Sequence, residues 1–190
     1  NIIKKFLFFK YFKFKKTHRL LDEKKGGGAI FDIGCYGVSS SRKIVETVFK
    51  EEIDFRLNNI NGKMGQTKID ESASVSLSFN NGVIANIRCS IIKNLENTIN
   101  IFGSKGEIKI LEPWTPSPEA KINLVNSKGK KIIKTGTNDS AYWYEIDFFN
   151  NVLNSNNETK EIAKQNQIRD IKQNSLAIID WRKILKQSMH

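Results

Sequence analysis

Residues 26–41 read GGGAIFDIGCYGVSSS, a glycine run followed by an amphipathic stretch. Three consecutive glycines cannot form the interior of a stable helix, because each costs about 1 kcal/mol there relative to alanine. They predict a flexible entry to the following segment, in which the backbone approaches its neighbours closely. The following residues predict a helix over 29–49, apolar on most faces and with one polar stripe. That stripe holds Asp32, Tyr36, Ser39, Lys43, Glu46 and Lys50.

Asp32 and Tyr36 lie one helical turn apart at the N-terminal end of the stripe, where the helix dipole favours negative charge. A carboxylate and a phenol so placed are candidates for polar chemistry. Structural roles are open as well. Asp32 can be a helix-start carboxylate, Tyr36 a half-buried aromatic with a satisfied hydroxyl, and the glycine run an ordinary turn before a core helix.

The pattern of this stretch resembles the catalytic helix of the Gfo/Idh/MocA oxidoreductases, and its tyrosine version is most similar to the glucose–fructose oxidoreductase and dihydrodiol dehydrogenase branch. The resemblance implies hydride transfer between a secondary alcohol and NAD or NADP. It also implies that Tyr36 moves the proton, that Asp32 holds a substrate hydroxyl or orients a lysine, and that the glycines lie near substrate and cofactor. In order, the residues that carry it are Gly26, Gly27, Gly28, Ile30, Phe31, Asp32 and Tyr36.

Composition places the chain among globular proteins of ordinary size. Its 190 residues predict a single domain over 1–190, or one half of a two-domain protein. The formal net charge is +11, which can indicate a nucleic-acid or anionic-membrane partner. Arginine is scarce, however, and the lysines are spread among many Asn and Ile residues. This distribution favours a biased background composition over a nucleic-acid-binding patch.

Cys35 and Cys89 are the only cysteines, and they show no metal-ligand spacing. Two thiols in a chain of this length indicate a reducing compartment, so we expect a cytoplasmic protein. Cys35 lies on the predicted catalytic helix, yet His18 and His190 lack any motif that would make them its base. A packed core thiol is the favoured interpretation. No apolar run is long enough for a transmembrane span.

The chain opens with NIIKKFLFFKYFKFKK, which lacks the uninterrupted apolar region and small-residue cleavage site of a signal peptide. Alternating phenylalanines at 6, 8, 12 and 14 predict a strand with solvated lysines rather than an RNA-stacking surface. A chain that begins directly in a strand, without a methionine, suggests that a segment upstream has been removed. Residues 17–25 predict a loop.

Alternating and turn-punctuated segments predict a series of antiparallel strands. In the clearest hairpin, Val75, Leu77 and Phe79 alternate with serines before an Asn-Asn-Gly turn. One face of this strand is therefore buried, and the serine face is wet or covered by a partner, so we expect a homo-oligomer. Gly103–Gly106 is too short for a P-loop and predicts a plain turn. The predicted strands are 53–60, 72–79, 83–92, 97–102, 107–111, 121–125 and 130–134.

Two helices close the chain. The first carries an apolar stripe of Tyr142, Ile146, Phe149 and Leu153, with Asp139 or Ser140 as its N-cap. The second covers 166–186, with Ile171, Asn174, Ile178, Trp181 and Leu185 on one stripe. Its Asn174-Ser175-Leu176 and Asp180-Trp181-Arg182 are similar to the closing helix of the same oxidoreductase branch, although Ala177-Ile178 replaces the usual Asn-Met of that branch.

These elements predict an α+β fold, a mostly antiparallel sheet with helices packed on one face. The chain has no Gly-x-Gly-x-x-Gly between a strand and a helix, and no βαβ alternation, so no Rossmann domain is expected. The Glu-Lys-Pro motif of the family is also absent. The resemblance therefore implies the substrate and oligomerisation half of an oxidoreductase for a sugar, polyol or cyclic diol, as a fragment or a truncated gene product. A non-catalytic binding domain and, less favoured, a basic nucleic-acid binder remain alternatives.

Overall fold

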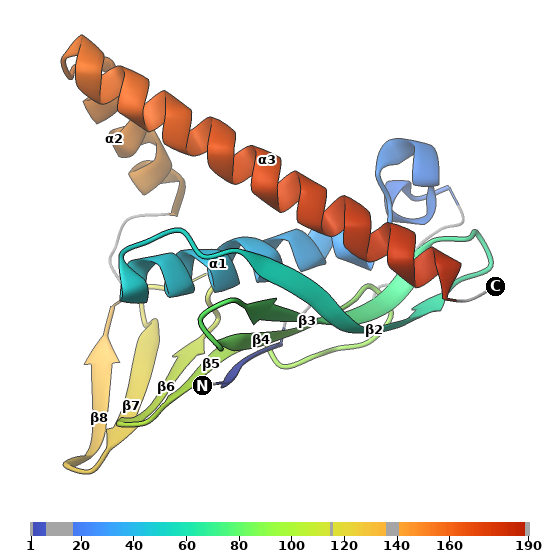
Figure 1. Cartoon of the computed structure of the whole chain (residues 1–190), viewed down its shortest axis with the longest axis horizontal. Helices are drawn as coiled ribbons and strands as arrows, with labels where there is room; N and C mark the ends of the chain where they lie inside the picture. Colours follow the sequence, from blue (N-terminus) through green and yellow to red (C-terminus); the bar gives the residue numbers. More distant parts are fainter. Residues whose placement is uncertain (1, 7–16, 115, 136–140, 189–190) are drawn as a thin grey trace.

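A computed structural model of the chain describes residues 2–6, 17–114, 116–135 and 141–188. Its strands form one eight-stranded sheet in the order β2-β3-β4-β1-β5-β6-β7-β8 (Figure 1). The strands are β1 (Ile2–Phe6), β2 (Phe55–Met64), β3 (Asp70–Phe79), β4 (Ile84–Ser90), β5 (Thr98–Gly103), β6 (Gly106–Leu111), β7 (Lys121–Asn126) and β8 (Gly129–Lys134). The helices are η1 (Arg19–Leu21), η2 (Glu23–Lys25), η3 (Ile30–Gly34), α1 (Cys35–Phe49), α2 (Ala141–Leu153) and α3 (Asn157–Gln187).

The sheet is antiparallel at every ladder between described strands except one. β1 runs parallel to β4 and antiparallel to β5, so it lies between two hairpin systems that are distant in sequence. No two described strands that flank a single helix are parallel neighbours, so the described residues contain no Rossmann-type unit. The predicted α+β class is confirmed.

The hairpins form as the turn residues predict. At the β3–β4 turn, Gly82 has a φ of 84°, and its N–H donates to the carbonyl of Phe79 at 2.9 Å. The Asn81 side chain accepts from the N–H of Val83 at 3.2 Å. The Gly103–Gly106 segment is the β5–β6 turn, as expected. The expected strand over the N-terminal phenylalanines is described only as far as Phe6, and the rest lies outside the described residues.

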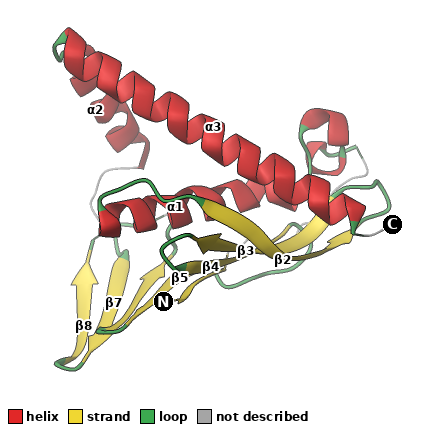
Figure 2. Ribbon diagram, in the orientation of Figure 1, coloured by secondary structure: helices red, strands yellow, loops and turns green. Residues whose placement is uncertain are grey.

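Helices cover one face of the β2–β3–β4 part of the sheet. Helix α1 lies on that face, and α3 crosses above it with its C-terminal half against α1 and β2 (Figures 1 and 2). Between these layers lies the hydrophobic core, where Val75 and Leu77 of β3 meet Val38 and Val45 of α1 and Trp181 of α3. The alternation in β3 therefore buries its apolar side chains as predicted, and the serines lie on the other face.

A buried arginine ties α1 to α3. Arg42 is almost fully buried, and its guanidinium lies 2.7 Å from Asn174 Oδ1 and 3.0 Å from Glu46 Oε1. It also donates to Gln173. Sequence patterning did not identify Arg42 because it belongs to neither the polar stripe nor the apolar faces. A buried charge needs such partners, so the network also fixes how α3 lies over α1.

Several sequence predictions need correction. Residues 17–25 are not a simple loop but contain the short helices η1 and η2, which are closed by local hydrogen bonds. Helices of three residues are too short to leave a periodic pattern of apolar residues in the sequence. Strand β2 runs on to Met64, four residues past the predicted end at residue 60, because an edge strand tolerates polar residues such as those at 61–63. Helix α3 begins at Asn157, with Asn156 accepting from Thr159 N–H as the N-cap, nine residues before the predicted start.

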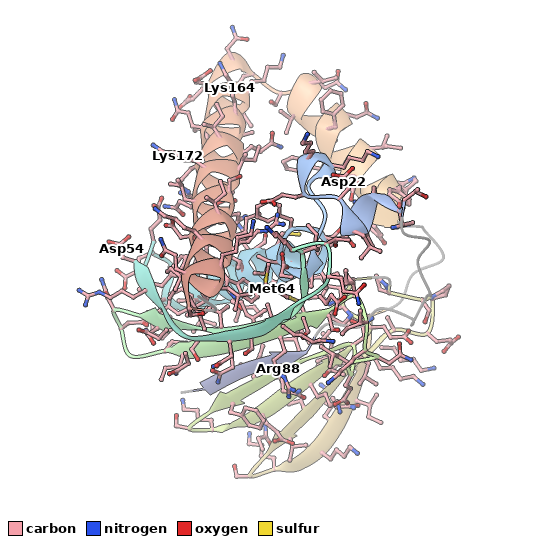
Figure 3. The ribbon with its side chains drawn as sticks, turned by 90° about the vertical axis from the view of Figure 1, so that its right-hand side faces the viewer. Asp22, Asp54, Met64, Arg88, Lys164 and Lys172 are labelled. Atoms are coloured by element: carbon pink, nitrogen blue, oxygen red, sulfur yellow. The ribbon has the colours of Figure 1, made fainter. Side chains whose placement is uncertain are left out.

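The predicted apolar stripes of the two closing helices differ in burial: the α2 stripe is exposed, whereas the α3 stripe is buried in its C-terminal part, at Trp181 and Leu185. The N-terminal half of α3 and the whole of α2 project away from the sheet (Figures 1 and 3). Ile171 on the α3 stripe and Val48 near the end of α1 are each 66% exposed, so neither belongs to the core. The α2 stripe of Tyr142, Ile146, Phe149 and Leu153 is exposed as well. The predicted α2 N-cap, Asp139 or Ser140, lies outside the described residues. No described helix is both long and apolar enough to cross a bilayer.

Candidate active site

The glycine run closes a tight turn between η2 and η3, and each glycine has a separate reason to lack a side chain. Gly26 has a φ of 69°, in the left-handed region. A Cβ on Gly27 would lie 2.6 Å from the carbonyl oxygens of Arg19 and Leu20. A Cβ on Gly28, whose φ is 111°, would overlap the carboxylate of Asp70. The turn is therefore a packed structural element rather than a flexible approach.

The predicted helix over 29–49 forms with an irregular first turn. Residues Ile30–Gly34 form a π-helical turn, η3, before α1 begins at Cys35. π-turns inside α-helices occur frequently at functional sites. Here the turn contains Asp32, whose backbone N–H donates to the carbonyl of Gly28 at 3.1 Å. The candidate site residues thus begin within one turn of the glycine run.

Two further glycines set the depth of the helix in the core. A Cβ on Gly34 would lie 2.8 Å from Cζ3 of Trp181 on α3. A Cβ on Gly37 would overlap Cγ2 of Ile87 on β4. The start of α1 is therefore held between α3 and the sheet at a separation that only glycine permits.

Asp32 is engaged by a residue that the sequence did not identify. Its Oδ1 lies 2.7 Å from Nη2 of Arg19, on η1. The Asp32 side chain is 12% exposed and that of Arg19 is 59% exposed, so the pair opens to solvent on the arginine side. The resemblance implies that Asp32 faces a substrate hydroxyl or a lysine. In the structure its carboxylate is already paired with a cation of this chain, Arg19. No sequence signal points to Arg19, because the η1 turn brings it there.

Tyr36 is half exposed, at 50%, on the first turn of α1. Its ring lies 5.5 Å from that of Trp114, centroid to centroid, with a tilt of 43°. Trp114 comes from the segment after β6 that holds all three prolines of the sequence. The phenol therefore lies at the surface beside the Trp114 ring, where a small molecule can approach it.

Partial burial raises the pKa of the Tyr36 phenol above its ordinary value near 10, and the neighbouring Cys35 thiol, Asp32 carboxylate and residues Tyr142 and Glu145 of α2 raise it further. Burial and negative neighbours both disfavour phenolate. At neutral pH Tyr36 therefore holds its proton. Removing that proton near neutral pH requires a nearby cation that lowers the pKa. The groups that shift the pKa of Tyr36 all raise it.

The two cysteines behave as core thiols. Burial raises the pKa of Cys35, with a smaller contribution from Asp32, and it raises that of the fully buried Cys89 well above the ordinary value. Both are free. A thiol whose pKa is raised is a poor nucleophile, so the favoured sequence interpretation of Cys35 as a packed residue agrees with its environment.

A buried ion pair lies beneath the glycine turn. Nε of Arg182 lies 3.1 Å from Oδ1 of Asp70, and both side chains are buried. Burial raises the pKa of the Asp70 carboxyl, although a hydrogen bond from the Ile30 N–H and the charge of Arg182 act to lower it. Sequence analysis placed Arg182 in a family-like motif without a role, and it did not single out Asp70.

The described residues do not offer a cradle for the pyrophosphate of a dinucleotide. The glycine turn is the natural candidate, but its N–H groups are used within the chain. Gly26 donates to Glu23, Gly27 to Asp22 and Gly28 to Leu20, at 3.1, 2.9 and 3.0 Å. Nor do the described residues bring together three His, Cys, Asp or Glu side chains that could hold a metal ion. What the site does offer is a proton-bearing group at its surface.

The groove between β2 and α3 lies apart from this site. It encloses about 440 Å³ and is lined by residues of β2, α3 and the end of α1, including Glu46, Phe55 and Asp180. Neither Asp32, Tyr36 nor the glycine run lines it. The candidate chemistry is thus located at the other end of α1, at the helix start.

Comparison with known proteins places this chain in an oxidoreductase family. The family profile described as the GFO/IDH/MocA C-terminal domain matches residues 5–109, more than half of the chain. The chain therefore belongs to the Gfo/Idh/MocA family, as the glycine and Asp-x-x-x-Tyr pattern predicts.

Curated relatives include trans-1,2-dihydrobenzene-1,2-diol dehydrogenases. That of Xenopus tropicalis is 34% identical over 120 residues, which cover 62% of this chain and 33% of the relative. That of Bos taurus is 30% identical over 102 residues, which cover 53% and 29%. The match to this chain thus spans about a third of the length of these relatives.

Solved structures share the fold at low identity. Aldose-aldose oxidoreductase from Caulobacter crescentus, complexed with glycerol, matches all of this chain and 54% of its own, with a TM-score of 0.69 and 12% identity. A mutant of KijD10, a 3-ketoreductase from Actinomadura kijaniata in complex with TDP-benzene and NADP, matches 84% of this chain and 48% of its own, with a TM-score of 0.67 and 16% identity. The chain spans about half of each, and these likenesses concern the fold.

Proposed function

We propose that this chain is the substrate-binding and catalytic-helix half of an NAD(P)-dependent oxidoreductase that acts on CH–OH groups of a sugar, polyol or cyclic diol. Its nicotinamide cofactor is held mainly by a dinucleotide-binding domain outside this sequence. The observation that carries the proposal is the surface position of the Tyr36 phenol, one turn from Asp32, on a helix start locked between α3 and the sheet. Membership of the family supports it.

Tyr36 carries the proton step. The nicotinamide, when bound, supplies or accepts the hydride at the carbinol carbon. When a carbonyl is reduced, the Tyr36 hydroxyl donates its proton to the carbonyl oxygen; when an alcohol is oxidised, Tyr36 receives it. A protonated phenol at neutral pH suits the first direction directly. The second requires a cation close to the phenol, and the lysine of the missing Glu-Lys-Pro motif would provide it.

Asp32 and Arg19 act together on the substrate. A carboxylate accepts hydrogen bonds from substrate hydroxyls, while a guanidinium donates to carbonyl or hydroxyl oxygens. Because the two groups are paired at 2.7 Å, they present an acceptor and a donor side by side near Tyr36. A vicinal diol or a hydroxy-ketone carries the matching pair of groups. The glycine turn lies next to this position and shapes it, while its own N–H groups remain bonded within the chain.

The remaining expectations belong to this proposal. The open serine face of the sheet is a homo-oligomer contact, because the helices among the described residues cover only the other face of β2–β3–β4. We place the protein in a reducing compartment, the cytoplasm, on account of its two free thiols. The alternative of a non-catalytic binding domain has one observation in its favour, the raised pKa of Tyr36 in the chain alone.

The proposal is tested by completing the enzyme. The dinucleotide-binding domain of the Xenopus tropicalis relative is joined to Asn1, and NADPH consumption is followed with glyceraldehyde and with a cyclic hydroxy-ketone. We expect turnover in the joined protein and none in the chain alone. No turnover with any carbonyl tested, in a joined protein that folds and binds NADPH, would favour the non-catalytic alternative.

A further inference from the structure

The ion pair of Asp70 and Arg182 is built into the protein at the place where the candidate site begins. Asp70 opens β3, and Arg182 lies in the last third of α3, so the pair joins two elements more than 100 residues apart in sequence. Asp70 is fully buried and Arg182 is 5% exposed. We call this pair, with its Nε–Oδ1 distance of 3.1 Å, the Asp70–Arg182 clamp.

The carboxylate of the clamp binds the backbone at the start of η3. While Oδ1 faces Arg182, Oδ2 accepts the N–H of Ile30 at 2.6 Å. The first N–H groups of a helix have no partner within the helix, and an anion there is favoured by the dipole. The same carboxylate fills the space that a Cβ of Gly28 would need. Asp70 therefore fixes the backbone at residues 28 and 30, two residues before Asp32.

The guanidinium of the clamp binds the side of the same turn. Arg182 lies 4.6 Å from the ring centroid of Phe31, a cation–π distance. Its neighbour Trp181 lies against Gly34 at the end of the turn. The π-turn that carries Asp32 is thus contacted at its start by Asp70 of the sheet and along its side by Arg182 and Trp181 of α3.

Stability alone does not explain a charged pair at this position. Replacing a buried ion pair by apolar residues of similar size is often neutral or stabilising, because the free-energy cost of desolvating the two charges can equal the gain from their attraction. The direction of the Asp70 pKa shift agrees with a dominant desolvation cost. What an apolar pair cannot do is hold the Ile30 N–H in a fixed direction, as the Asp70 carboxylate does.

We propose that Asp70 and Arg182 are positioning residues of the site: the clamp fixes the π-turn so that Asp32 and Tyr36 are held at their working separation. This proposal rests on the proposed function for its catalytic consequence, but its structural part does not. Neither residue touches substrate, since both lie beneath the turn. Geometry held to within about 1 Å matters greatly for proton transfer, where a small misplacement costs up to about 100-fold in rate.

The test uses three variants of the full chain and of the joined enzyme. Asp70→Asn weakens the bond to Ile30, Arg182→Lys keeps the charge but loses the planar contact with Phe31, and Glu71→Gln is the matched control. Glu71 follows Asp70 in β3 and has its own ion pair, with Lys63, at 3.3 Å. Should a single change leave an unpaired charge that prevents folding, the double variant Asp70→Asn with Arg182→Met removes both charges together.

Two readouts separate positioning from simple stabilisation. In the chain alone, amide hydrogen exchange over residues 26–36 should rise at least about 10-fold in the clamp variants, while β3 and β4 keep their protection. In the joined enzyme, kcat should fall by roughly 10- to 100-fold with the KM for substrate nearly unchanged. The Glu71→Gln control should show neither effect.

Each failure has a distinct meaning. Unchanged exchange over residues 26–36, or an equal rise across the whole chain, would overturn the clamp as a positioning device. A KM effect without a kcat effect would overturn it as well. If the parent joined enzyme is inactive while exchange rises locally in the clamp variants, the proposed function fails and the structural role of the clamp stands.

Discussion

Nη2 of Arg19 lies 2.7 Å from Oδ1 of Asp32, so the carboxylate of the candidate site is paired within this chain. Arg19 is on η1 and Asp32 is on η3, and the glycine turn between them sets the distance. The pair also bears on Tyr36, because the charge of Asp32 raises the pKa of that phenol. Arg19 partly offsets this charge.

Two substitutions around this pair should move the pKa of Tyr36 in opposite directions. Asp32→Asn removes a negative neighbour and should lower it, whereas Arg19→Met exposes the full charge of Asp32 and should raise it further. ¹³C-tyrosine NMR across pH 8–12 measures both, with Tyr36→Phe assigning the signal. Shifts of the same sign in both variants would contradict the electrostatic account.

The same pKa predicts how stability depends on alkaline pH. The folded-state pKa of Tyr36 lies above its unfolded value near 10, so the protonated phenol stabilises the fold fully below about pH 10. That contribution is lost as the pH rises through the folded-state pKa. Urea unfolding of the parent and of Tyr36→Phe between pH 9 and 11.5 should therefore show a shallower decline for the variant, and equal slopes would rule the shift out.

The chain alone should bind no dinucleotide. All three N–H groups of its glycine turn are bonded within the chain, and the described strands form no βαβ unit that could hold a pyrophosphate. Titration with NADH and NADPH, followed by nicotinamide fluorescence, checks this. Saturable binding at micromolar concentration to the chain would contradict it, while the joined enzyme serves as the positive control.

In the joined enzyme, Tyr36→Phe should lower turnover by roughly 10²–10⁴-fold, the usual contribution of a positioned acid–base group. Removing only the hydroxyl leaves the ring beside Trp114, so cofactor affinity and folding should change little. Tyr144→Phe, an equally exposed phenol on α2, is the matched control. A variant that keeps most of the parental rate would move the proton step to another group.

Gly37→Ala should destabilise the fold by about 1–3 kcal/mol, because its methyl group would overlap Cγ2 of Ile87 and the core must shift. Gly103→Ala is the control, since the nearest atom there lies 3.7 Å from the added Cβ. Urea unfolding gives the free energies. Adding Ile87→Ala to Gly37→Ala should cost less than the sum of the single changes, whereas strict additivity would show that the two residues do not compete for space.

The open face of the sheet should mediate self-association. Ser74 lies at the centre of this face opposite Arg88 of β4, which Figure 3 shows on the side of the sheet away from α3. Ser74→Lys places a second cation there and should dissociate a homo-oligomer in light scattering at tens of micromolar. Ser127→Lys, at the β7–β8 turn, is the control. A parent chain that is monomeric under these conditions would contradict the expectation.

Most of the fold could be predicted from patterns within short segments of the sequence. The Asn-Asn-Gly turn and the Val75, Leu77 and Phe79 alternation predicted β3 and β4 because a hairpin needs only neighbouring residues. The closing helix was predicted too short, because the sequence after Asn156 has no apolar face and its capping asparagine was not recognised. The η1 and η2 turns were missed since hydrogen bonds over three residues leave no periodicity.

The sequence by itself determined the family and the α+β class, and it placed the candidate pair Asp32 and Tyr36 one helical turn apart, because helical spacing and a glycine run are local properties of the chain. Only the tertiary structure decided what surrounds that pair. Arg19 pairs with Asp32, Trp114 packs near Tyr36, and Asp70 and Arg182 contact the π-turn. Asp70 and Arg182 are more than 100 positions apart in the sequence. Such contacts depend on how helices and strands pack, and no periodicity within one segment encodes them.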